Sequence, residues 1–448
     1  MNNVNGWIEP RLVAIALMLG CSAKSEMRSN ESVATGLILI DTNGVVVDDQ
    51  GDERPWVDVK VDIVEGTPES PADLGDTPTW SGFGAIHVRG NSTSDYEKKQ
   101  YSFETRDADG EDVDATFFGL PEEEDWVLAA PYSDKTLMRN HLMFSWSRAI
   151  DRYAPRTRFV ELYMDDEGDA LGPEDYRGVY VLTEKVKRDI HRVNVAKLET
   201  TDSDPSVVTG GYLLRRDWVE EEPIETALYG DMLMLESPKP DEVTAPQLDY
   251  ISGYLNDFEA ALSRADGSHD EYIDVDSFAD FMLMMELSRN VDAYVLSTYM
   301  HKPRGGRLSM GPIWDFNGSL GNADYFDAWQ TEGWHYENPE FPADNPNGFH
   351  WYRALLEDGE FRQRLAERWE MHRSGPWSDS ALMKSIGDAE ETLQAMQRRN
   401  FERWPVLGEQ IWPNDEGAAQ RQTYQDEVDY LRRWVLRRTA WLDAQLSQ

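Results

Sequence analysis

The chain reads Asn290-Val291-Asp292 directly after an apolar helical pattern and Gly311-Pro312-Ile313-Trp314-Asp315-Phe316 a short way further on. Asp315 lies 23 positions after Asp292. Between the two aspartates, Val295–Met300 and Arg307–Met310 predict a short hairpin. A carboxylate on each side of a hairpin can supply a general base and a ligand for a hard metal ion. The alternative is a pair of turn-forming aspartates that only cap a helix and the hairpin.

Length and composition indicate a folded, strongly acidic protein. With 448 residues the chain can form two or three domains, or one large domain with a helical extension. An aromatic content of 11%, with 16 Trp, argues against a disordered chain. The formal net charge of −41 repels the phosphate backbones of nucleic acids, so no nucleic-acid partner is expected. The same charge favours solubility at high salt, or basic partners.

The single cysteine, Cys21, follows Gly20 and the apolar run Leu12–Leu19. The eight residues of this run are too few to span a bilayer, which needs about 20. They fit the core of a secretory signal, and Leu-Gly-Cys after such a run resembles the signal of bacterial lipoproteins. We therefore expect an exported protein, lipid-anchored through Cys21 to the bacterial cell envelope, with no other membrane contact. A plain signal peptide or a mis-assigned start is the alternative.

Strand patterns dominate the first half of the chain. Val57–Val64 alternates apolar and charged residues with period two, which is typical of a half-buried strand. An Asn43-Gly44 turn between two apolar runs predicts a β-hairpin. The predicted strands are Leu37–Ile40, Val45–Val47, Val57–Val64, Gly84–Arg89, Lys99–Thr105, Phe159–Tyr163, Val179–Leu182 and Gly210–Arg215.

Helical patterns appear later and then take over. Asp134 can cap a helix that runs to Ile150, and further helices are predicted at Pro246–Leu262 and Ser277–Arg289. From about residue 350 the pattern is helical throughout, with an apolar stripe near the end of the chain. The prediction is an α+β protein with a β-rich N-terminal part and a helical C-terminal part.

Eight motifs follow one another along the chain. They are Arg89-Gly90-Asn91-Ser92, Lys98-Lys99, Asp134 with Arg139-Asn140, Tyr176-x-Gly178-x-Tyr180-x-Leu182-x-Glu184, Gly210-Gly211-Tyr212, Ser237-Pro238-Lys239-Pro240, Asn290-x-Asp292 and Gly311-Pro312-x-Trp314-Asp315-Phe316. Taken in this order they resemble the spore-coat protein H (CotH) kinase family over roughly residues 80–400. The resemblance implies an atypical protein-kinase-like fold and an enzyme that uses ATP and Mg²⁺ to phosphorylate Ser or Thr of surface or coat proteins. Many bacterial members are secreted or surface-attached, which agrees with Cys21.

The resemblance also suggests how the chain is organised. We expect a lipoprotein signal peptide over residues 1–21, a flexible tether over 22–33, an N-terminal β region over 34–80, a kinase-like CotH core over 81–330 and a helical C-terminal subdomain over 331–448.

Within this resemblance, Asp292 is the candidate catalytic base and Asp315 the candidate Mg²⁺ ligand, because hard oxygen ligands suit that ion. Asn317 occupies the neighbouring metal position, where family members commonly carry a second Asp. Ser297, five residues after Asp292, replaces the Asn that binds metal in ordinary kinases.

Candidate ATP contacts lie on the predicted strands. Lys99 would share a strand face with Tyr101 and direct its ammonium group towards the phosphates, whereas Lys98 would face the surface. Glu184 follows the strand pair at the position where a kinase-like fold places its hinge, although an isolated Glu is more often a surface residue.

The turn Gly90-Asn91-Ser92 could bring backbone N–H groups, together with Arg89, close to phosphate oxygens. The alternative is an ordinary hairpin turn, and no standard glycine-rich phosphate loop is present. Two functions therefore remain open. One is a kinase that acts on a protein substrate; the other is a catalytically inactive surface lipoprotein that acts as a binding or structural module.

Overall fold

The computed structural model of the protein describes residues 35–48, 54–67, 70–338 and 350–446. The expected signal peptide, its Cys21 and the expected tether lie outside these residues. None of the helices in the described ranges combines the length and the apolar character that a bilayer crossing requires.

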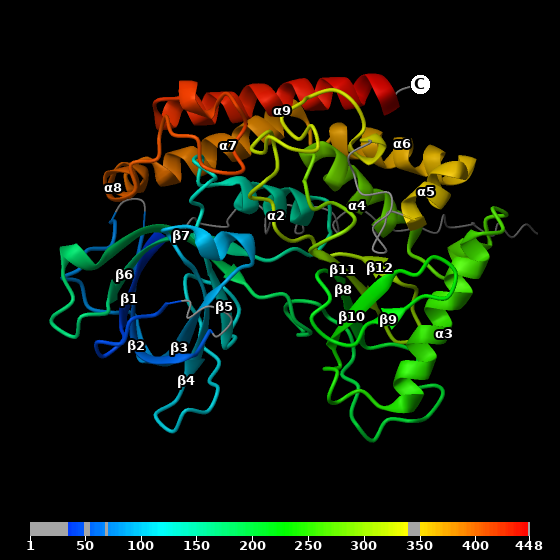
Figure 1. Ribbon diagram of the computed structural model, residues 1–448, viewed down its shortest axis with the longest axis horizontal. Helices are drawn as coiled ribbons and strands as arrows, with labels where there is room; N and C mark the ends of the chain where they lie inside the picture. Colours follow the sequence, from blue (N-terminus) through cyan, green and yellow to red (C-terminus); the bar gives the residue numbers. More distant parts are fainter. Residues whose placement is uncertain (1–34, 49–53, 68–69, 339–349, 447–448) are drawn as a thin grey trace, which may run out of the picture. The chain divides into compact units, whose positions relative to one another are not determined.

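The first part of the described chain is a closed seven-stranded barrel in the order β1-β2-β3-β4-β5-β7-β6 (Figure 1). All neighbouring pairs whose register is known are antiparallel except β1 and β6, which run parallel and close the barrel. Its interior is filled by apolar side chains such as Ile38, Ile63, Ile86, Phe103 and Leu162. The strands are β1 Thr35–Asp41, β2 Val57–Gly66, β3 Trp80–Arg89, β4 Gln100–Arg106, β5 Asp125–Ala129, β6 Thr157–Asp165 and β7 Tyr176–Glu184.

One predicted hairpin is wrong. Val45–Val47 is not a strand, and Val45 and Val46 are exposed. The two edges of β1 are already taken, since Ile38 lies opposite Ile63 of β2 and Leu162 of β6. No edge of β1 remains with which residues 45–47 could pair.

The helix α2, Arg139–Ala149, connects β5 to β6 and starts five residues later than its predicted cap. Leu137 has a φ of 64°, so the chain turns sharply before the helix begins. Asp134 nevertheless holds the first turn, because its Oδ2 accepts the Arg139 backbone N–H at 2.8 Å. Asp134 and Arg139 also form an ion pair that is fully buried.

A second sheet, in the order β12-β11-β8-β10-β9, follows the barrel. The predicted hairpin between the two aspartates is confirmed, since β11 and β12 pair antiparallel with Met300 opposite Met310. The predicted Met-rich helix face is buried in the core, with Phe281, Met282 and Met285. The elements are β8 Tyr212–Arg216, β9 Ile224–Glu225, β10 Met232–Ser237, α3 Ala245–Leu262, α4 Val275–Ser288, β11 Thr298–Lys302 and β12 Ser309–Met310.

The C-terminal part is helical, as predicted, and lies over α2 and α4 in Figure 1. Contacts of α6 and α9 with α4, of α7 with α2, and of α8 with β7 attach it to the rest of the described chain. The helices are α5 His350–Glu357, α6 Gly359–Arg373, α7 Asp379–Leu393, α8 Met396–Arg403 and α9 Tyr424–Leu446. Single-turn 3₁₀ segments occur at Ser92–Asp95, Pro173–Asp175, Ser268–Glu271, His335–Glu337 and Ala418–Gln420. The protein is thus a mixed α+β protein.

Candidate active site

One buried side chain joins the two turns that carry the predicted aspartates. The Asn290 Oδ1 accepts the Asp292 backbone N–H at 3.1 Å, and its Nδ2 donates to the Asp315 carbonyl oxygen at 2.8 Å. Asn290 is 2% exposed and directly follows Arg289, whose φ of 47° ends α4. The structure therefore brings Asp292 and Asp315 together through a single carboxamide.

A second carboxamide, Asn140 in the first turn of α2, supports Asp315 from the other side. Its Oδ1 accepts the Phe316 backbone N–H at 2.6 Å, and its Nδ2 donates to Asn317 Oδ1 at 3.1 Å. Asn317 in turn donates from Nδ2 to Asp315 Oδ1 at 3.2 Å. Asp315 has a φ of 58°, a conformation that non-glycine residues adopt rarely and that surrounding contacts must hold.

The charges around this pair are unbalanced. Burial and the nearby charges of Asp315 and Asp217 raise the pKa of Asp292 to about 7. Burial also raises the pKa of Asp315, against the opposing effects of the Arg89 charge and of hydrogen bonds from Asn317. The charges of Asp292, Asp315 and Asp217 thus act on one another, and the positive charge of Arg89 partly compensates that of Asp315. Perturbed carboxyl groups of this kind are common at functional sites.

Asp217 was not predicted as a site residue. It follows the last residue of β8, and burial raises its pKa while the Arg215 charge lowers it. Arg215 Nη1 lies 3.8 Å from Asp217 Oδ2. A sequence signal did exist, because Asp217 comes directly after the strand that begins at the Gly210-Gly211-Tyr212 motif.

Aromatic side chains lie beside the two aspartates. The charges of Asp292 and Asp315 act on Tyr325, and burial raises the pKa of Tyr325. Tyr325 stacks on Trp412 with ring centroids 6.2 Å apart and planes at 2°, and Trp412 is 53% exposed. The Tyr96 hydroxyl donates to the Trp412 carbonyl oxygen at 2.6 Å. We call Tyr96, Tyr325 and Trp412 the aromatic ledge.

Arg89 lies near Asp315, as the sequence suggested. Its guanidinium carbon is 5.5 Å from the centroid of the Trp314 ring. Gly90 has a φ of 96°, and a Cβ there would lie 2.0 Å from Thr93 Oγ1, so the turn after β3 requires glycine. Asn91 and Ser92 are exposed.

The two lysines differ from their prediction. Lys98, expected at the surface, is 1% exposed, and its Nζ donates to the Val179 carbonyl oxygen and to Asn400 Oδ1. Burial lowers its pKa well below the usual range. Strand β4 begins only at Gln100, so the alternation of faces does not extend back to the lysines. The Lys99 Nζ donates to the Ser94 carbonyl oxygen at 2.6 Å and so contacts the turn after β3.

Glu184 is a buried ion-pair residue at the end of β7. Its carboxylate accepts the Arg156 backbone N–H at 2.8 Å, the Arg156 Nε–H at 2.9 Å and the Tyr153 hydroxyl at 3.3 Å. These partners come from the segment between α2 and β6. Glu184 is 1% exposed and thus forms part of the interior.

Two acidic groups could be considered for a metal ion. Asp114, Glu123 and Glu124 place oxygens within 4.8 Å of one another, the tightest carboxylate group of this kind in the described ranges. However, Lys187 Nζ already lies 2.8 Å from Glu123 Oε1 and 2.5 Å from Glu124 Oε1. Asp292, Asp315 and Asp217 are less tightly grouped, so a cation held by Asp315 would need oxygen ligands from a bound phosphate as well.

Comparison with known proteins gives one result. The model of a family described as CotH kinase protein matches residues 86–442, which is well over half of the chain. The match includes all the residues around Asp292 and Asp315 described above. None of the curated proteins matches the sequence.

Proposed function

Since the chain belongs to the CotH kinase protein family, we propose that it is an atypical protein kinase that transfers the γ-phosphoryl group of ATP to Ser or Thr of a protein, with Mg²⁺. The observation that carries this proposal is the pair Asp292 and Asp315, joined by Asn290 and left with raised pKa values. In a kinase-like fold the barrel would form the N-terminal lobe, and the second sheet with its helices the C-terminal lobe.

Asp292 is the proposed base. As the acceptor hydroxyl oxygen bonds to the γ-phosphorus, Asp292 takes the hydroxyl proton and ADP leaves with the electron pair of the broken P–O bond. A pKa of about 7 suits this role, because the group is partly ionised near neutral pH and still binds the proton well.

Asp315, with Asn317 beside it, is the proposed Mg²⁺ site. The ion, when bound, would neutralise the phosphate charge during transfer. Carboxylate and carboxamide oxygens fit a hard cation, and the excess of carboxylates around Asp315 favours one. Arg89 and the turn that contains Gly90, Asn91 and Ser92 would contact phosphate oxygens, and Lys99 would hold that turn through Ser94.

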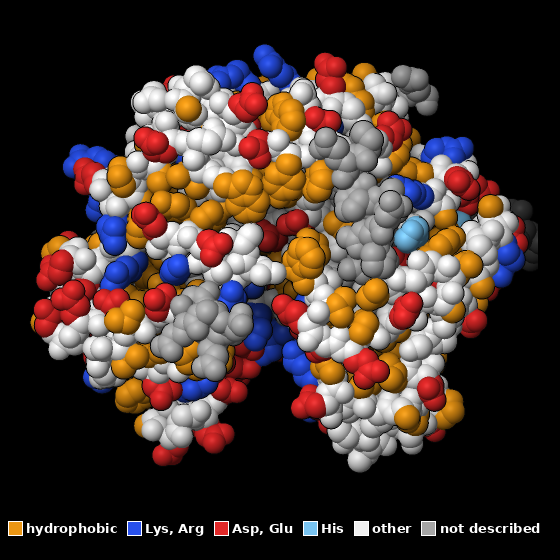
Figure 2. Space-filling view, in the orientation of Figure 1, with side chains coloured by type: hydrophobic (Ala, Val, Ile, Leu, Met, Phe, Trp, Pro, Cys, Tyr) orange, Lys and Arg blue, Asp and Glu red, His pale blue; other side chains and the backbone are white. Residues whose placement is uncertain are grey.

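The acceptor protein is proposed to bind along the aromatic ledge. Figure 2 shows the face hollowed between the barrel and the second sheet, with acidic and basic side chains inside the hollow. Several exposed carboxylates lie within a few positions of Tyr96, Tyr325 and Trp412 along the chain. Their negative charge favours an acceptor protein with a basic segment, whose Lys or Arg can stack on Trp412. These carboxylates are Asp95, Glu97, Asp324, Asp327, Glu409 and Glu416.

One observation favours the second candidate function, a catalytically inactive surface module. Asp114, Glu123 and Glu124 place their oxygens within 4.8 Å of one another. In the described ranges, no third carboxylate comes that close to both Asp292 and Asp315. The metal position therefore depends on Asp315, Asn317 and whatever oxygens a phosphate adds. An inactive module would keep the fold and bind a partner without using ATP.

The place of action is proposed from the sequence alone. An exported protein, lipid-anchored through Cys21, would incorporate labelled palmitate in bacteria, and Cys21→Ala would abolish the labelling. Absence of label in the parent chain would contradict the anchor without touching the kinase proposal.

The kinase proposal is tested by transfer from labelled ATP to the chain itself and to a basic Ser-containing protein, in Mg²⁺ and in Mn²⁺. We expect transfer by the parent chain and none by Asp315→Asn. Thermal stabilisation by Mg·ATP should also be lost in that variant. No transfer and no stabilisation with either metal would contradict the kinase function and support the inactive module.

A further inference from the structure

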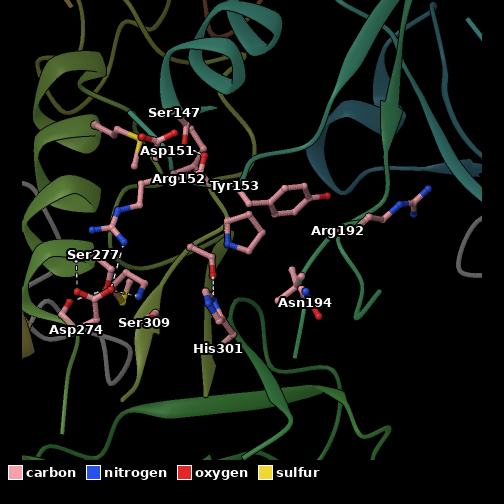
Figure 3. A pocket seen from close by; sticks show the side chains of 16 residues that line it. Ser147, Asp151, Arg152, Tyr153, Arg192, Asn194, Asp274, Ser277, His301 and Ser309 are labelled. Carbon is pink, nitrogen blue, oxygen red and sulfur yellow. Dashed lines mark hydrogen bonds and ion pairs between the residues drawn. The ribbon is translucent and has the colours of Figure 1, made fainter. Parts of the chain in front are cut away.

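A cavity with a volume of 310 Å³ is lined in part by Gly311, Pro312 and Ile313, which shortly precede Asp315. Figure 3 shows the side chains around it. Its walls come from the end of α2, from α4, from the β11–β12 hairpin and from the linker after β7. No residue of the barrel strands lines it, and neither do Arg89, Asp217, Asp292 or Asp315. The volume is at the lower end of the range for small-molecule pockets, roughly 300–1,000 Å³.

His301 offers a hydrogen-bond acceptor to this cavity. Its Nδ1 lies 3.0 Å from the Gly311 carbonyl oxygen, as the dashed line in Figure 3 marks. A carbonyl oxygen can only accept, so Nδ1 carries the proton. Burial lowers the pKa of His301, which keeps the ring neutral and leaves Nε2 as an acceptor.

Asn194 offers a donor and an acceptor from another wall. Its side chain is exposed, lines the cavity and comes from the linker that connects the barrel to β8. A carboxamide can form two hydrogen bonds with a heterocycle that presents a donor next to an acceptor, as it does with adenine. The Ser309 hydroxyl adds a third polar group on the β12 side.

The charged side chains that line the cavity are balanced, in contrast to those around Asp292, because Asp151 and Asp274 are matched in number by Arg152 and Arg192. Arg152 is paired with Asp274 at 3.2 Å and with Asp280 at 2.7 Å. A cationic ligand would be repelled by the arginines of the cavity and an anionic ligand by its aspartates. A neutral ligand is therefore favoured. The rings of Tyr153 and Pro312 supply flat apolar surface for a ring to stack on.

We propose that this cavity binds a neutral, flat nitrogen heterocycle of nucleobase or nucleoside size, at a site separate from the Asp292–Asp315 pair. One ring N–H or amino group would donate to His301 Nε2, and the Asn194 carboxamide would pair with a neighbouring edge. Because Gly311 and Pro312 form part of the wall, the ligand would stabilise the turn that carries Asp315. The cavity would then act as an effector site.

Binding of adenine and of adenosine to the full chain, measured by calorimetry, tests the proposal and separates a free base from a nucleoside. We expect at least one of them to bind to the parent chain, to Asp315→Asn and to the chain saturated with Mg·ATP, although the affinity can differ among these because an effector site is coupled to the site that it affects. Binding is measured without phosphoryl transfer, so the result for this cavity can be told apart from success or failure of the kinase proposal. No binding of either probe at millimolar concentration, or competition with Mg·ATP, would overturn the separate site.

Three variants and a control locate the site. Asn194→Leu should weaken binding at least tenfold, whereas Gln394→Leu, the same change at an exposed carboxamide near the end of α7, should not alter it. His301→Asn keeps a donor towards Gly311 but removes the Nε2 acceptor, and should also weaken binding. Ser309→Phe should fill the cavity and abolish binding while the melting temperature stays within a few degrees. Unchanged affinity in Asn194→Leu and Ser309→Phe would overturn the assignment.

Discussion

Asp280 and the pair Asp292–Asp315 mark two clusters of charged side chains with opposite effects on an aspartate pKa. Burial alone would raise the pKa of Asp280, but hydrogen bonds from His372 and Arg368, with the charge of Arg152, lower it below the usual range. Arg152 Nε lies 2.7 Å, Arg368 Nε 2.8 Å and His372 Nε2 2.7 Å from the Asp280 carboxylate. Asp292, which is partly buried, has a pKa raised to about 7.

The difference lies in the partners, because Asp280 is the less exposed of the two side chains and its pKa is nevertheless lowered. Asp280 on α4 joins the α2–β6 segment to α6 through three side chains, so its charge is fully compensated. Asp292 has other carboxylates as its electrostatic neighbours, with a single arginine near Asp315. A compensated cluster contributes to stability, whereas an uncompensated one is costly unless a ligand neutralises it. Substitutions in the two clusters should therefore separate stability from activity.

The largest expected effect is on activity. Asp292→Asn should reduce phosphoryl transfer by about 10²–10⁴-fold, because the acceptor hydroxyl loses its base. The free energy of unfolding should stay the same or rise, since a like-charge repulsion with Asp315 disappears. Transfer assays and chemical denaturation of the same preparation measure both. Retained transfer in a folded Asp292→Asn protein would remove Asp292 from the role of base.

The second effect is on stability. Asp280→Asn should lower the free energy of unfolding by about 3–5 kcal/mol, because Arg152 and Arg368 lose a buried counter-charge. Urea denaturation is the measurement. The matched control is Asp276→Asn on the same helix, whose side chain is 32% exposed. Asp276 pairs with Arg364 and, at 3.4 Å, with Arg368 at a partly exposed site where solvent weakens ion pairs, so a smaller loss is expected. Equal losses in the two variants would contradict the distinction.

The third effect concerns the residue that joins the two aspartate turns. Asn290→Ala leaves the Asp292 N–H and the Asp315 carbonyl oxygen without their partner, at a cost of about 1–3 kcal/mol. We expect transfer to fall as well, because the two carboxylates are no longer held at a fixed spacing. Asn290→Asp, which keeps only the acceptor towards Asp292, should lie between Asn290→Ala and the parent chain in stability. Full activity of Asn290→Ala would show that the spacing is set elsewhere.

The fourth effect is a difference in pH dependence. The pKa of Asp292 is raised from about 3.8 to about 7, so between these values the folded protein holds a proton that the unfolded chain has released. Its contribution to stability is therefore lost as the pH rises through this window. The pKa of Asp280 is lowered, so its contribution is lost when the pH falls through the folded-state value. Denaturation of the parent chain and of Asp292→Asn from pH 5 to pH 8 should show the parent losing stability relative to the variant. A parallel pair of curves would contradict the raised pKa.

The smallest effect concerns the aromatic ledge beside Asp292 and Asp315. Trp412→Ala should raise the KM for a basic protein substrate about two- to fivefold, as expected for the loss of an exposed cation–π contact of about 0.5–1 kcal/mol. The kcat should not change, because Trp412 contacts no reacting group. Steady-state kinetics with basic and acidic substrates measure the effect. Weaker binding of both substrates alike would argue against charge recognition.

Sequence reasoning identified Asp292, Asp315 and the hairpin between them because each depends on local chemistry. The Gly and Pro residues around the turns, and the apolar run of α4, are visible in the sequence. Asn290 was quoted in the motif, yet its role as a bridge became evident only from its two hydrogen bonds. Asp217 was missed because it approaches the pair from β8, more than 70 residues earlier in the chain.

The lysines illustrate a different limit. Alternation of faces predicts side-chain direction only within a strand, and Lys98 and Lys99 precede β4. The hydrogen bond from Lys98 to Asn400 of α8 spans 302 positions, and no local pattern contains that information. The mistaken hairpin at Val45–Val47 has the same origin, since β1 pairs with β2 on one side and on the other with β6, which lies far along the chain.

The sequence by itself determined the mixed α+β class, the two aspartates with their hairpin, and the family to which the chain is similar. The class and the hairpin follow from turn residues and periodicity, which act over a few positions, whereas the family follows from the resemblance of the eight ordered motifs. Only the tertiary structure decided that the barrel closes by pairing β1 with β6, that Lys98 is buried, and that Asp292 and Asp280 have opposite pKa directions. Strand partners, burial and ionic neighbours depend on segments that meet only after folding, and these long-range contacts set the energy of each charge.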